Sequence, residues 1–319
     1  MSTTRCWARR TGCSWSRRAE PRSRWSSGVP ELPEAETIAR GLNRILPGRV
    51  VSAVTVLRED VVSGTPSRFA AAVAGKRFGA TGRRGKNVVL ALEDPSRATV
   101  GRAVDRVVVN LGMTGRLVPG SGAGPASAST HPAVLFRLRD GGSLTYDDVR
   151  RFGLLTHVPG AEWRRWSRRL GPEPLARSFT GARLRGILAR SRSPVRSLLL
   201  DQRRIAGVGN IYAVEALWFA RIHPRTPANA IGDRAGARLH RSLRRVLRRA
   251  VEAGGTTLRN YRAPDGNEGR FRRALHAYGR EGLPCFRCRA PIGRIVFGGR
   301  SAYLCPRCQP EPRGRGAAP

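Results

Sequence analysis

The chain has 319 residues, with 59 lysines and arginines against 22 acids, so its formal net charge is +37. No stretch of about 18 apolar residues is present, which excludes a membrane-spanning helix, and the length favours two or more domains. Such a surplus of cations indicates a polyanionic partner, most simply the phosphates of nucleic acid.

Residues 1–29 differ from the rest of the chain. They hold seven arginines and a single acid, and they show neither an apolar period nor the continuous apolar stretch of a secretory signal. We favour a start assigned too early, because a GTG start codon read as internal would give Val29; a transit leader and a genuine disordered arm are the alternatives. The first two origins make Pro30 an N-terminal secondary amine, which can attack carbon, whereas the third leaves it an unreactive amide.

The body of the chain begins with a predicted amphipathic helix after Pro30, with Glu34 in the first turn, where the helix dipole favours acids. Short β-like runs follow, separated by glycine, proline and serine, at 50–57, 87–92, 106–111, 133–138, 143–146 and 154–158. This pattern predicts an antiparallel β-sandwich with a leading helix over residues 30–160.

Helical patterns replace the β-like runs after a basic, proline-containing linker at 161–178. They cover 184–189, 194–200, 211–222 and 235–253. They predict a helical domain over residues 179–275, followed by a cysteine-containing module at 276–309 and a disordered tail at 310–319. The expected class is therefore an α+β multidomain protein.

Four cysteines near the C-terminus have the spacing of a structural zinc site. Cys285 and Cys288 form one Cys-x-x-Cys pair, and sixteen residues later Cys305 and Cys308 form the second. Four thiolates leave no open coordination position, so one Zn²⁺ would fold the module and perform no chemistry. The segment between the pairs predicts a hairpin, and Arg300, just past its turn, is a candidate phosphate contact. Outside the leader no cysteine is spare for a disulfide, which favours a reducing, cytoplasmic compartment.

A glycine turn precedes the predicted helix that begins near Asn210. In Gly207-Val208-Gly209-Asn210, the glycines lie just before the helix start, where free backbone N–H groups can bind an anion. Asn210 would cap the helix or donate to a phosphate. A purely structural glycine turn is the alternative interpretation.

In combination, these features resemble the formamidopyrimidine-DNA glycosylases, within the wider family that includes endonuclease VIII. The resemblance covers residues 30–309 and rests on segments that occur in family order: Pro30-Glu31-Leu32-Pro33-Glu34, Arg84-Gly85-Lys86, Asn110-Leu111-Gly112-Met113-Thr114-Gly115, Arg150-Arg151-Phe152-Gly153, Leu170-Gly171-Pro172-Glu173-Pro174-Leu175, Gly207-Val208-Gly209-Asn210-Ile211-Tyr212, Gly254-Gly255-Thr256-Thr257, and the four cysteines with Arg300. It implies a β-sandwich, a helix–two-turns–helix DNA-binding domain and a zinc finger. It also implies base excision repair, in which 8-oxoguanine and formamidopyrimidines are removed and the abasic site is cleaved.

The resemblance assigns the chemistry to the start of the body. Pro30 would attack C1′ of a flipped-out nucleotide, and the resulting iminium would allow β- and then δ-elimination. Glu31 would act as general acid and base, and Glu34 would orient the N-terminal amine. A plain helix entry accounts for Glu34 but gives no reason for Pro30.

The resemblance also assigns DNA contacts. Met113, Arg150 and Phe152 would fill the gap that the flipped nucleotide leaves, although pattern alone makes core positions the simpler interpretation of Met113 and Phe152. Arg151 belongs to the same motif.

Lys86 and Arg300 would hold phosphates at the catalytic centre together with Asn210. Lys86 is one of only two lysines in the chain, which suggests that a compact ammonium is needed there. Asn110 and Arg196 are also among the DNA contacts that the resemblance implies, but both depart from the family pattern: Asn110 stands where histidine is usual, and Arg196 stands where a lysine linked to 8-oxoguanine processing is usual. Lesion preference is therefore in doubt.

Three functions stay open at this point. The first is the bifunctional glycosylase and lyase for oxidised purines, which the loop Thr256–Gly269 favours because it resembles the segment that closes over such bases. The second is an endonuclease VIII-like glycosylase for oxidised pyrimidines, and the third is a non-catalytic lesion-binding protein, if Pro30 is not the N-terminus. We expect a monomer that binds double-stranded DNA with oxidised bases or abasic sites, in the cytoplasm and associated with the nucleoid, without membrane contact.

Overall fold

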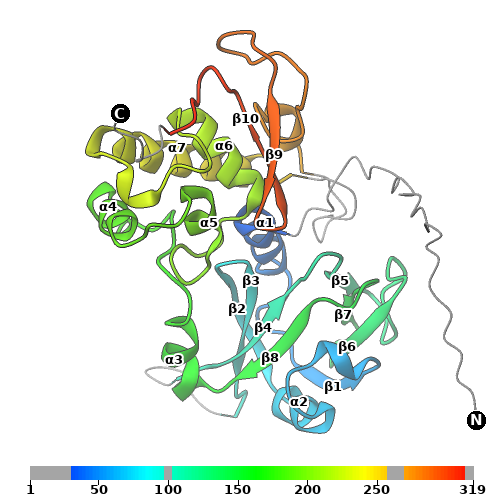
Figure 1. The fold of residues 1–319 in the computed structure, drawn as a ribbon. Helices are drawn as coiled ribbons and strands as arrows, with labels where there is room; N and C mark the ends of the chain where they lie inside the picture. Colours follow the sequence, from blue (N-terminus) through cyan, green and yellow to red (C-terminus); the bar gives the residue numbers. More distant parts are fainter. Residues whose placement is uncertain (1–29, 97–102, 257–268, 313–319) are drawn as a thin grey trace, which may run out of the picture.

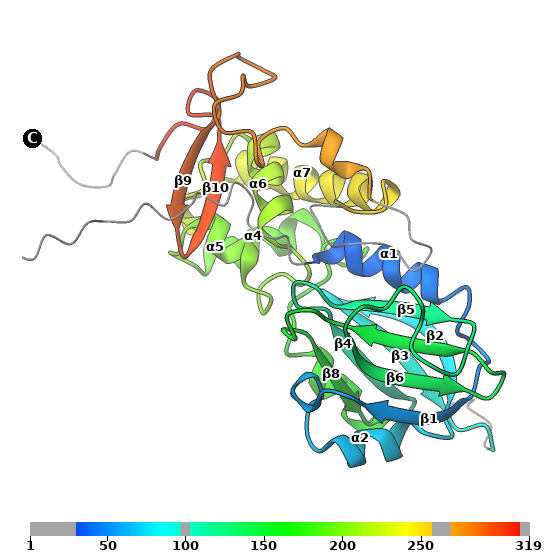
Figure 2. The ribbon, with the colours of Figure 1, turned by 90° about the vertical axis from the view of Figure 1, so that its right-hand side faces the viewer.

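The computed structural model describes residues 30–96, 103–256 and 269–312. The leader, most of the loop expected to close over purines, and the end of the tail therefore lie outside the described residues. The described part forms a β-sandwich and a helical body that carries a β-hairpin, with the first helix between the two (Figure 1, Figure 2).

The sandwich consists of two four-stranded antiparallel sheets, with strand orders β1-β6-β7-β5 and β2-β3-β4-β8. The strands are β1 (Val51–Val56), β2 (Arg77–Arg84), β3 (Asn87–Glu93), β4 (Asp105–Asn110), β5 (Arg116–Gly120), β6 (Pro132–Leu138), β7 (Ser143–Asp147) and β8 (Leu154–Val158). The sequence pattern did not predict β2 or β5. β2 contains three arginines and two glycines, and β5 contains Pro119, so neither has an apolar alternation. Pairing with neighbouring strands forms both, and proline is tolerated in β5 because that strand lies at a sheet edge.

Helix α1 (Leu32–Leu42) joins the two bodies. Most of its apolar face, including Ala35, Ile38 and Leu42, is buried in the core of the sandwich. Its first residue, Leu32, belongs instead to the core of the helical body. The N-terminus of α1 is therefore held at the junction of the two bodies, and this position decides where Pro30 and Glu31 lie.

The helical body and the cysteine module share one hydrophobic core. Its main helices are α4 (Gly181–Ala189), α5 (Val195–Leu200), α6 (Asn210–Ala220) and α7 (Asp233–Glu252), and its hairpin is β9 (Gly293–Phe297) and β10 (Arg300–Leu304). The shorter elements of the chain are α2 (Pro66–Val73), α3 (Trp163–Ser167), η1 (Glu59–Val61), η2 (Gly160–Glu162), η3 (Ala228–Ala230) and η4 (Phe271–Ala274). Cys285, Ile292 and Cys305 are buried in the same cluster as the helices. The hairpin is consequently fixed against α6.

The segment predicted as a linker is tied to the sandwich mainly through Arg84, and Arg83 also pairs with Glu173 at 2.8 Å. Arg84, at the end of β2, donates to the Leu170 and Gly171 carbonyl oxygens at 2.7 and 2.8 Å and to Glu173 at 2.9 Å. It also donates to both the hydroxyl and the carbonyl oxygen of Ser167. These bonds hold the turn between β2 and β3 against the linker, and that turn carries Lys86.

Candidate functional site

The N-terminus of α1 meets the N-terminus of α6, and a buried carboxylate lies between them. Glu31 Oε1 accepts a hydrogen bond from the Ile211 backbone N–H at 3.0 Å. A Cβ atom at Gly209 would lie 2.1 Å from Glu31 Cδ, so only glycine lets the carboxylate approach the helix end. The anion site predicted from the glycine turn is thus filled by the chain's own Glu31.

Glu31 is held in a state that favours a proton. Burial raises its pKa to about 7, which Lys86 opposes and Glu34 reinforces. Its second carboxylate oxygen, Oε2, is buried without a hydrogen-bond partner among the described residues. A carboxyl group that is half protonated near neutral pH and has one free oxygen is suited to general acid–base chemistry.

Donors from three described residues anchor Glu34. Its carboxylate accepts from the Glu31 backbone N–H at 2.9 Å, the Tyr212 hydroxyl at 2.5 Å and the Thr256 N–H at 2.7 Å. Gly255, just before Thr256, has φ +85° and no room for a side chain, because a Cβ would lie 2.9 Å from Glu34 Oε1. Glu34 therefore fixes the peptide that follows Pro30 and ties it to α6 and to the end of α7.

Lys86 is presented to this site by the turn between β2 and β3. It is half-buried, and its ammonium has no hydrogen-bond or ion-pair partner within the part of the chain that the structure describes. Burial lowers its pKa, Glu31 raises it, and Arg300 lowers it further. The structure thus brings Lys86, Glu31 and Arg300, which are far apart in the sequence, within electrostatic range of one another.

Arg196 lies inside the protein and not on its surface. Its side chain is 1% exposed. It donates twice to Asn210 Oδ1, at 2.8 and 3.1 Å, and to the Phe297 and Ser301 carbonyl oxygens at 3.2 and 3.3 Å. A buried guanidinium with this set of acceptors clamps α5, α6 and the hairpin together, and the part of Arg196 in DNA binding stays a prediction.

The clamp also fixes the orientation of Asn210. Because Asn210 Oδ1 faces Arg196, its amide nitrogen must point the other way, and it donates to the Ser301 carbonyl at 3.0 Å. One amide hydrogen of Asn210 remains for another acceptor. The side chain of Arg300, the neighbour of Ser301 on β10, is exposed and has no hydrogen-bond partner among the described residues.

The residues expected to enter DNA lie on two adjoining loops at one end of the sandwich. Met113 is half-buried, and Phe152 is 58% exposed with the Arg150 guanidinium 4.6 Å from its ring centroid. Arg151 has a left-handed backbone (φ 55°) and pairs with Asp60 at 3.2 Å. A core position for Phe152 is therefore excluded.

Asp148, which sequence reasoning missed, holds these two loops together. This buried carboxylate accepts from the Thr114 hydroxyl at 2.5 Å, the Gly153 N–H at 2.9 Å and the Arg150 N–H at 3.3 Å. The Tyr146 hydroxyl donates to it at 3.0 Å. The only sign of Asp148 in the sequence was its position as an acid next to a functional motif. Asp147 has the same position, so the sequence could not distinguish the two.

Asn110 has a local role in the same region. Its oxygen accepts from the Gly112 N–H, and its amide nitrogen donates to Asn87, both at 3.0 Å. It therefore shapes the turn that leads to Met113, with one amide hydrogen left over.

The four cysteine sulfurs lie within 4.8 Å of one another. Cys285 and Cys305 are buried, and Cys288 and Cys308 are half-buried. The Cys288 Sγ atom lies 3.4 Å from Cys305 Sγ and 3.5 Å from Cys308 Sγ. Sulfur–sulfur distances this short are consistent with four thiolates around one tetrahedral metal ion. These side chains can hold one Zn²⁺.

Comparison with known proteins agrees with this architecture. Residues 29–155 match the model of the formamidopyrimidine-DNA glycosylase N-terminal domain, and residues 170–262 match its H2TH domain. Residues 282–310 match a zinc finger found in FPG and IleRS. The chain belongs to the formamidopyrimidine-DNA glycosylase family. The resemblance, the fold class and the four-cysteine zinc module expected from the sequence are confirmed.

Relatives and solved structures of this family extend over nearly all of the described chain. A formamidopyrimidine-DNA glycosylase of Methylobacterium nodulans is 42% identical and covers 88% of this chain and 99% of its own length. The structure of MutM (FPG) from Thermus thermophilus is 39% identical, with TM-score 0.76, and covers 89% of this chain and 100% of its own. A Lactococcus lactis FPG mutant solved with a Fapy-dG-containing DNA is 30% identical, with TM-score 0.80, over 88% of this chain and 100% of its own.

In this family member the zinc module supports the helical body. Cys285 and Cys305 share the core of the helices. We therefore expect removal of the zinc by a chelator to raise the rate of amide hydrogen exchange in α6 and the hairpin, and to leave the strands of the sandwich protected. Hydrogen exchange with mass spectrometry, alongside metal analysis expected to give one zinc per chain, measures this. Equal loss of protection in both bodies would contradict it.

The second expectation concerns Asp148. Asp148→Asn places an amide N–H₂ among four donors, so we expect a loss of about 2–3 kcal/mol in the free energy of unfolding and faster exchange in both loops. Asp60→Asn is the matched control, because its pair with Arg151 is half exposed at both ends and is worth roughly 0–1 kcal/mol. Urea unfolding and hydrogen exchange of 111–115 and 149–153 measure this, and equal effects in the two variants would contradict it.

Within the described residues, none of the helices combines the length and the apolar character that a bilayer span requires.

Proposed function

We propose that this chain is a bifunctional DNA glycosylase and abasic-site lyase that removes oxidised bases from double-stranded DNA in base excision repair. The observation that carries the proposal is the buried Glu31 carboxyl, whose pKa is raised to about 7. It lies directly after Pro30 and within electrostatic range of Lys86. The names of the relatives and the titles of neighbours bound to Fapy-dG or abasic-site DNA support the same activity.

The proposed reaction requires residue 30 to be the first residue of the working protein. The Pro30 nitrogen bonds C1′, the bond from C1′ to the base breaks, and the base leaves with the electron pair and a proton. Opening of the sugar ring gives an iminium, because a secondary amine cannot form a neutral imine. Loss of the C2′ proton then expels the 3′ phosphate, and a second elimination expels the 5′ phosphate.

The chain's own groups have separate tasks in this scheme. Glu31 donates and accepts the protons, and Glu34 keeps the peptide after Pro30 in place. Lys86, Arg300 and the free amide hydrogen of Asn210 bind phosphate oxygens around the flipped nucleotide.

On the duplex side, Met113, Arg150 and Phe152 fill the gap left by that nucleotide, with Arg150 able to pair with the orphaned base. Arg151 and Asn110 position these loops.

Oxidised purines are the proposed main substrates, and oxidised pyrimidines are a second candidate. The purine preference rests on the loop resemblance at 256–269, of which residues 257–268 lie outside the described part. The pyrimidine candidate is favoured by one observation: a Lactococcus lactis FPG neighbour, 29% identical with TM-score 0.78, was solved with an oxidised pyrimidine-containing DNA. Incision of matched duplexes that carry 8-oxoguanine, formamidopyrimidine or an oxidised pyrimidine ranks the lesions.

Borohydride trapping on an abasic-site duplex tests the mechanism. The chain that starts at Pro30 is expected to form a covalent adduct, and the same chain with one glycine added before Pro30 is expected to form none, because its proline is an amide. A full-length chain of residues 1–319 gives a third arm. Equal trapping of the glycine-extended chain would overturn the assignment, because the trapped amine would then be the α-amine of the added glycine or one of the two lysines, Lys76 and Lys86.

A further inference from the structure

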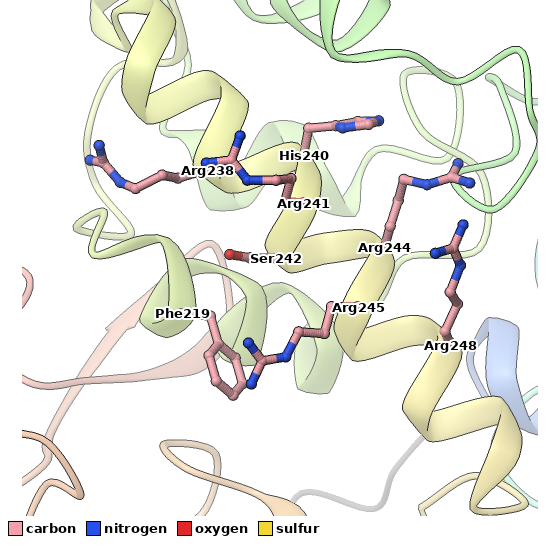
Figure 3. Close-up of a pocket in the computed structure, with 8 residues that line it drawn as sticks. All are labelled: Phe219, Arg238, His240, Arg241, Ser242, Arg244, Arg245 and Arg248. Atoms are coloured by element: carbon pink, nitrogen blue, oxygen red, sulfur yellow. The ribbon is translucent and has the colours of Figure 1, made fainter.

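Helix α7 presents a cationic surface that the proposed reaction does not use. Its apolar residues, including Leu239, Leu243 and Leu247, are buried in the helical core. Five arginines of the same helix, together with neighbouring side chains, line a cavity of about 490 Å³ (Figure 3): Phe219, Arg238, His240, Arg241, Ser242, Arg244, Arg245 and Arg248. We call this the α7 arginine surface.

Three of the arginines are held in place by part of their hydrogen-bonding or stacking capacity. Arg238 donates through Nε to the Ala220 carbonyl at 3.3 Å. Arg244 donates through one Nη to two linker carbonyls, both at 2.7 Å. The Arg245 guanidinium lies 4.8 Å from the Phe219 ring centroid, and Figure 3 shows the two side chains against each other. Each guanidinium keeps further N–H donors, so the surface is ordered before any ligand arrives.

Among the described residues, no acid balances this surface. Its lining contains no carboxylate, and none of its arginines forms an ion pair within the described residues. Asp233, in the first turn of α7, pairs with Arg185 of α4 instead. Arginines such as Arg241 and Arg245 stand four positions apart, where like charges destabilise a helix. Codon bias explains arginine in place of lysine but does not explain the missing acids.

The Phe219 end of the surface is separated from the reaction site along α6. Asn210 begins this helix at the reaction site, and Phe219 lies nine residues later, which corresponds to about 14 Å along the axis. At the other end, Arg248 lies closer to α1 (Figure 3). A ligand held at the Phe219 end therefore need not displace one bound at Glu31 and Lys86.

We propose that the α7 arginine surface is a second nucleic-acid site, which binds the phosphate backbone of a duplex segment other than the one being repaired. Arginines three or four positions apart repeat every 5–6 Å or so along the helix surface. The row from Arg238 to Arg248 is about 15 Å long, which matches about four nucleotide steps of a strand at 3.4 Å each. A regular, closely spaced polyanion fits this row, and Phe219 adds apolar contact for the sugars.

Counting bound duplexes tests the proposal. The chain is mixed with excess short duplex that carries a tetrahydrofuran abasic-site analogue, and the stoichiometry is measured by native mass spectrometry and sedimentation at low salt. We expect two duplexes per chain for the wild type and one for the triple variant Arg241→Gln/Arg245→Gln/Arg248→Gln. The matched control Arg164→Gln/Arg165→Gln/Arg168→Gln removes the same charge from exposed positions in and beside α3 and is expected to keep two.

The salt dependence gives a second readout. For the wild type, the affinity for the second duplex is expected to fall with salt with a log–log slope of about −2.7 or steeper, from at least three phosphate contacts, and an unchanged melting temperature of the triple variant is the check on folding. One duplex per wild-type chain, or two per α7 variant, would overturn the proposal. Loss of the second duplex in the control variant would show that its binding depends on overall charge. Displacement of the second duplex by polyglutamate at a lower concentration than by duplex would assign the surface to an acidic protein. Either result also overturns the proposal. These readouts need binding only, so a chain without glycosylase activity would still give an answer.

Discussion

Glu31→Gln is expected to lower the rate of base release by at least about 100-fold, because it removes the one carboxyl placed to exchange a proton beside Pro30. The substitution keeps the shape of the side chain and an oxygen that can accept from the Ile211 N–H. Single-turnover release of a damaged base at saturating enzyme measures the effect without a contribution from DNA binding. Glu36→Gln, on the same helix but outside the site, is the control and is expected to keep the wild-type rate.

The raised pKa of Glu31 adds a stability effect with a definite sign. The unfolded chain releases the Glu31 proton near its ordinary value of 4.5, whereas the folded chain holds it up to about pH 7. Between these values the folded state binds more protons, so the stability of the wild type falls as the pH rises. The stability of Glu31→Gln relative to the wild type is therefore expected to grow by about 2.5 kcal/mol from pH 5 to pH 8, as measured by urea unfolding.

For the general-acid assignment, the wild-type rate of base release is expected to decline as the pH rises through 7, and this decline should be absent in the residual activity of Glu31→Gln. A variant that keeps full activity, or a wild-type rate that is flat through pH 7, would remove Glu31 from the mechanism.

Arg196→Met is expected to reduce kcat/KM on a lesion duplex by about 10- to 100-fold, although Arg196 is buried and donates to acceptors of the chain itself. The loss follows from the acceptors that the change leaves behind: Asn210 Oδ1 and two carbonyls of the hairpin. A charge-assisted hydrogen bond contributes about 1.5–3 kcal/mol. We expect most of the effect in KM, because Arg196 acts on phosphate binding by positioning Asn210 and β10.

A double-mutant cycle distinguishes this positioning role from general destabilisation. If Arg196 acts through Asn210, then Arg196→Met and Asn210→Ala together should cost little more than the larger single change. Arg196→Lys, which restores the residue usual in the family, is expected to recover part of the loss, because an ammonium reaches Asn210 but cannot serve all the acceptors at once. Arg185→Met, an exposed arginine of α4, is the control. Additive effects in the cycle would contradict the positioning role.

The Arg196 environment also explains the pKa of that side chain. Burial, and after it the neighbouring Arg300, lower the pKa of Arg196 to about 10. A buried cation without an anionic partner is costly, and here backbone and amide oxygens offset that cost. Phosphate bound beside Arg300 would provide the missing counter-charge, so DNA binding should stabilise the clamp.

Local sequence patterns were enough for much of the fold. Apolar alternation located six of the eight strands of the sandwich, and helical spacing located α1 and the helices from α4 to α7, because each of these elements has a distinct buried face. The paired Cys-x-x-Cys spacing was enough for the zinc module. β2 and β5 were not predicted from the sequence, because long-range pairing, and not their own residue pattern, makes them strands.

Only part of the candidate site could be predicted from the sequence. Motifs indicated Glu31, Lys86 and Arg300 individually, but the spatial grouping depends on Leu32 entering the helical core and on Arg84 binding the linker. The same limit explains Asp148 and Arg196. A sequence shows an acid or a base, while the surrounding donors and acceptors decide whether it is free or structural.

The sequence by itself determined the order of the three modules, the metal ligands and the residue types that the chemistry needs, because periodicity, spacing and side-chain chemistry are local properties. Only the tertiary structure decided that Glu31 fills the end of α6, that Arg196 is a buried clamp, and that α7 carries a cationic surface at the far end of α6. The burial of a side chain and the identity of its hydrogen-bond partners depend on which distant segments meet. Burial and partners in turn set the pKa of each titratable side chain and the number of its hydrogen-bond donors and acceptors that stay free.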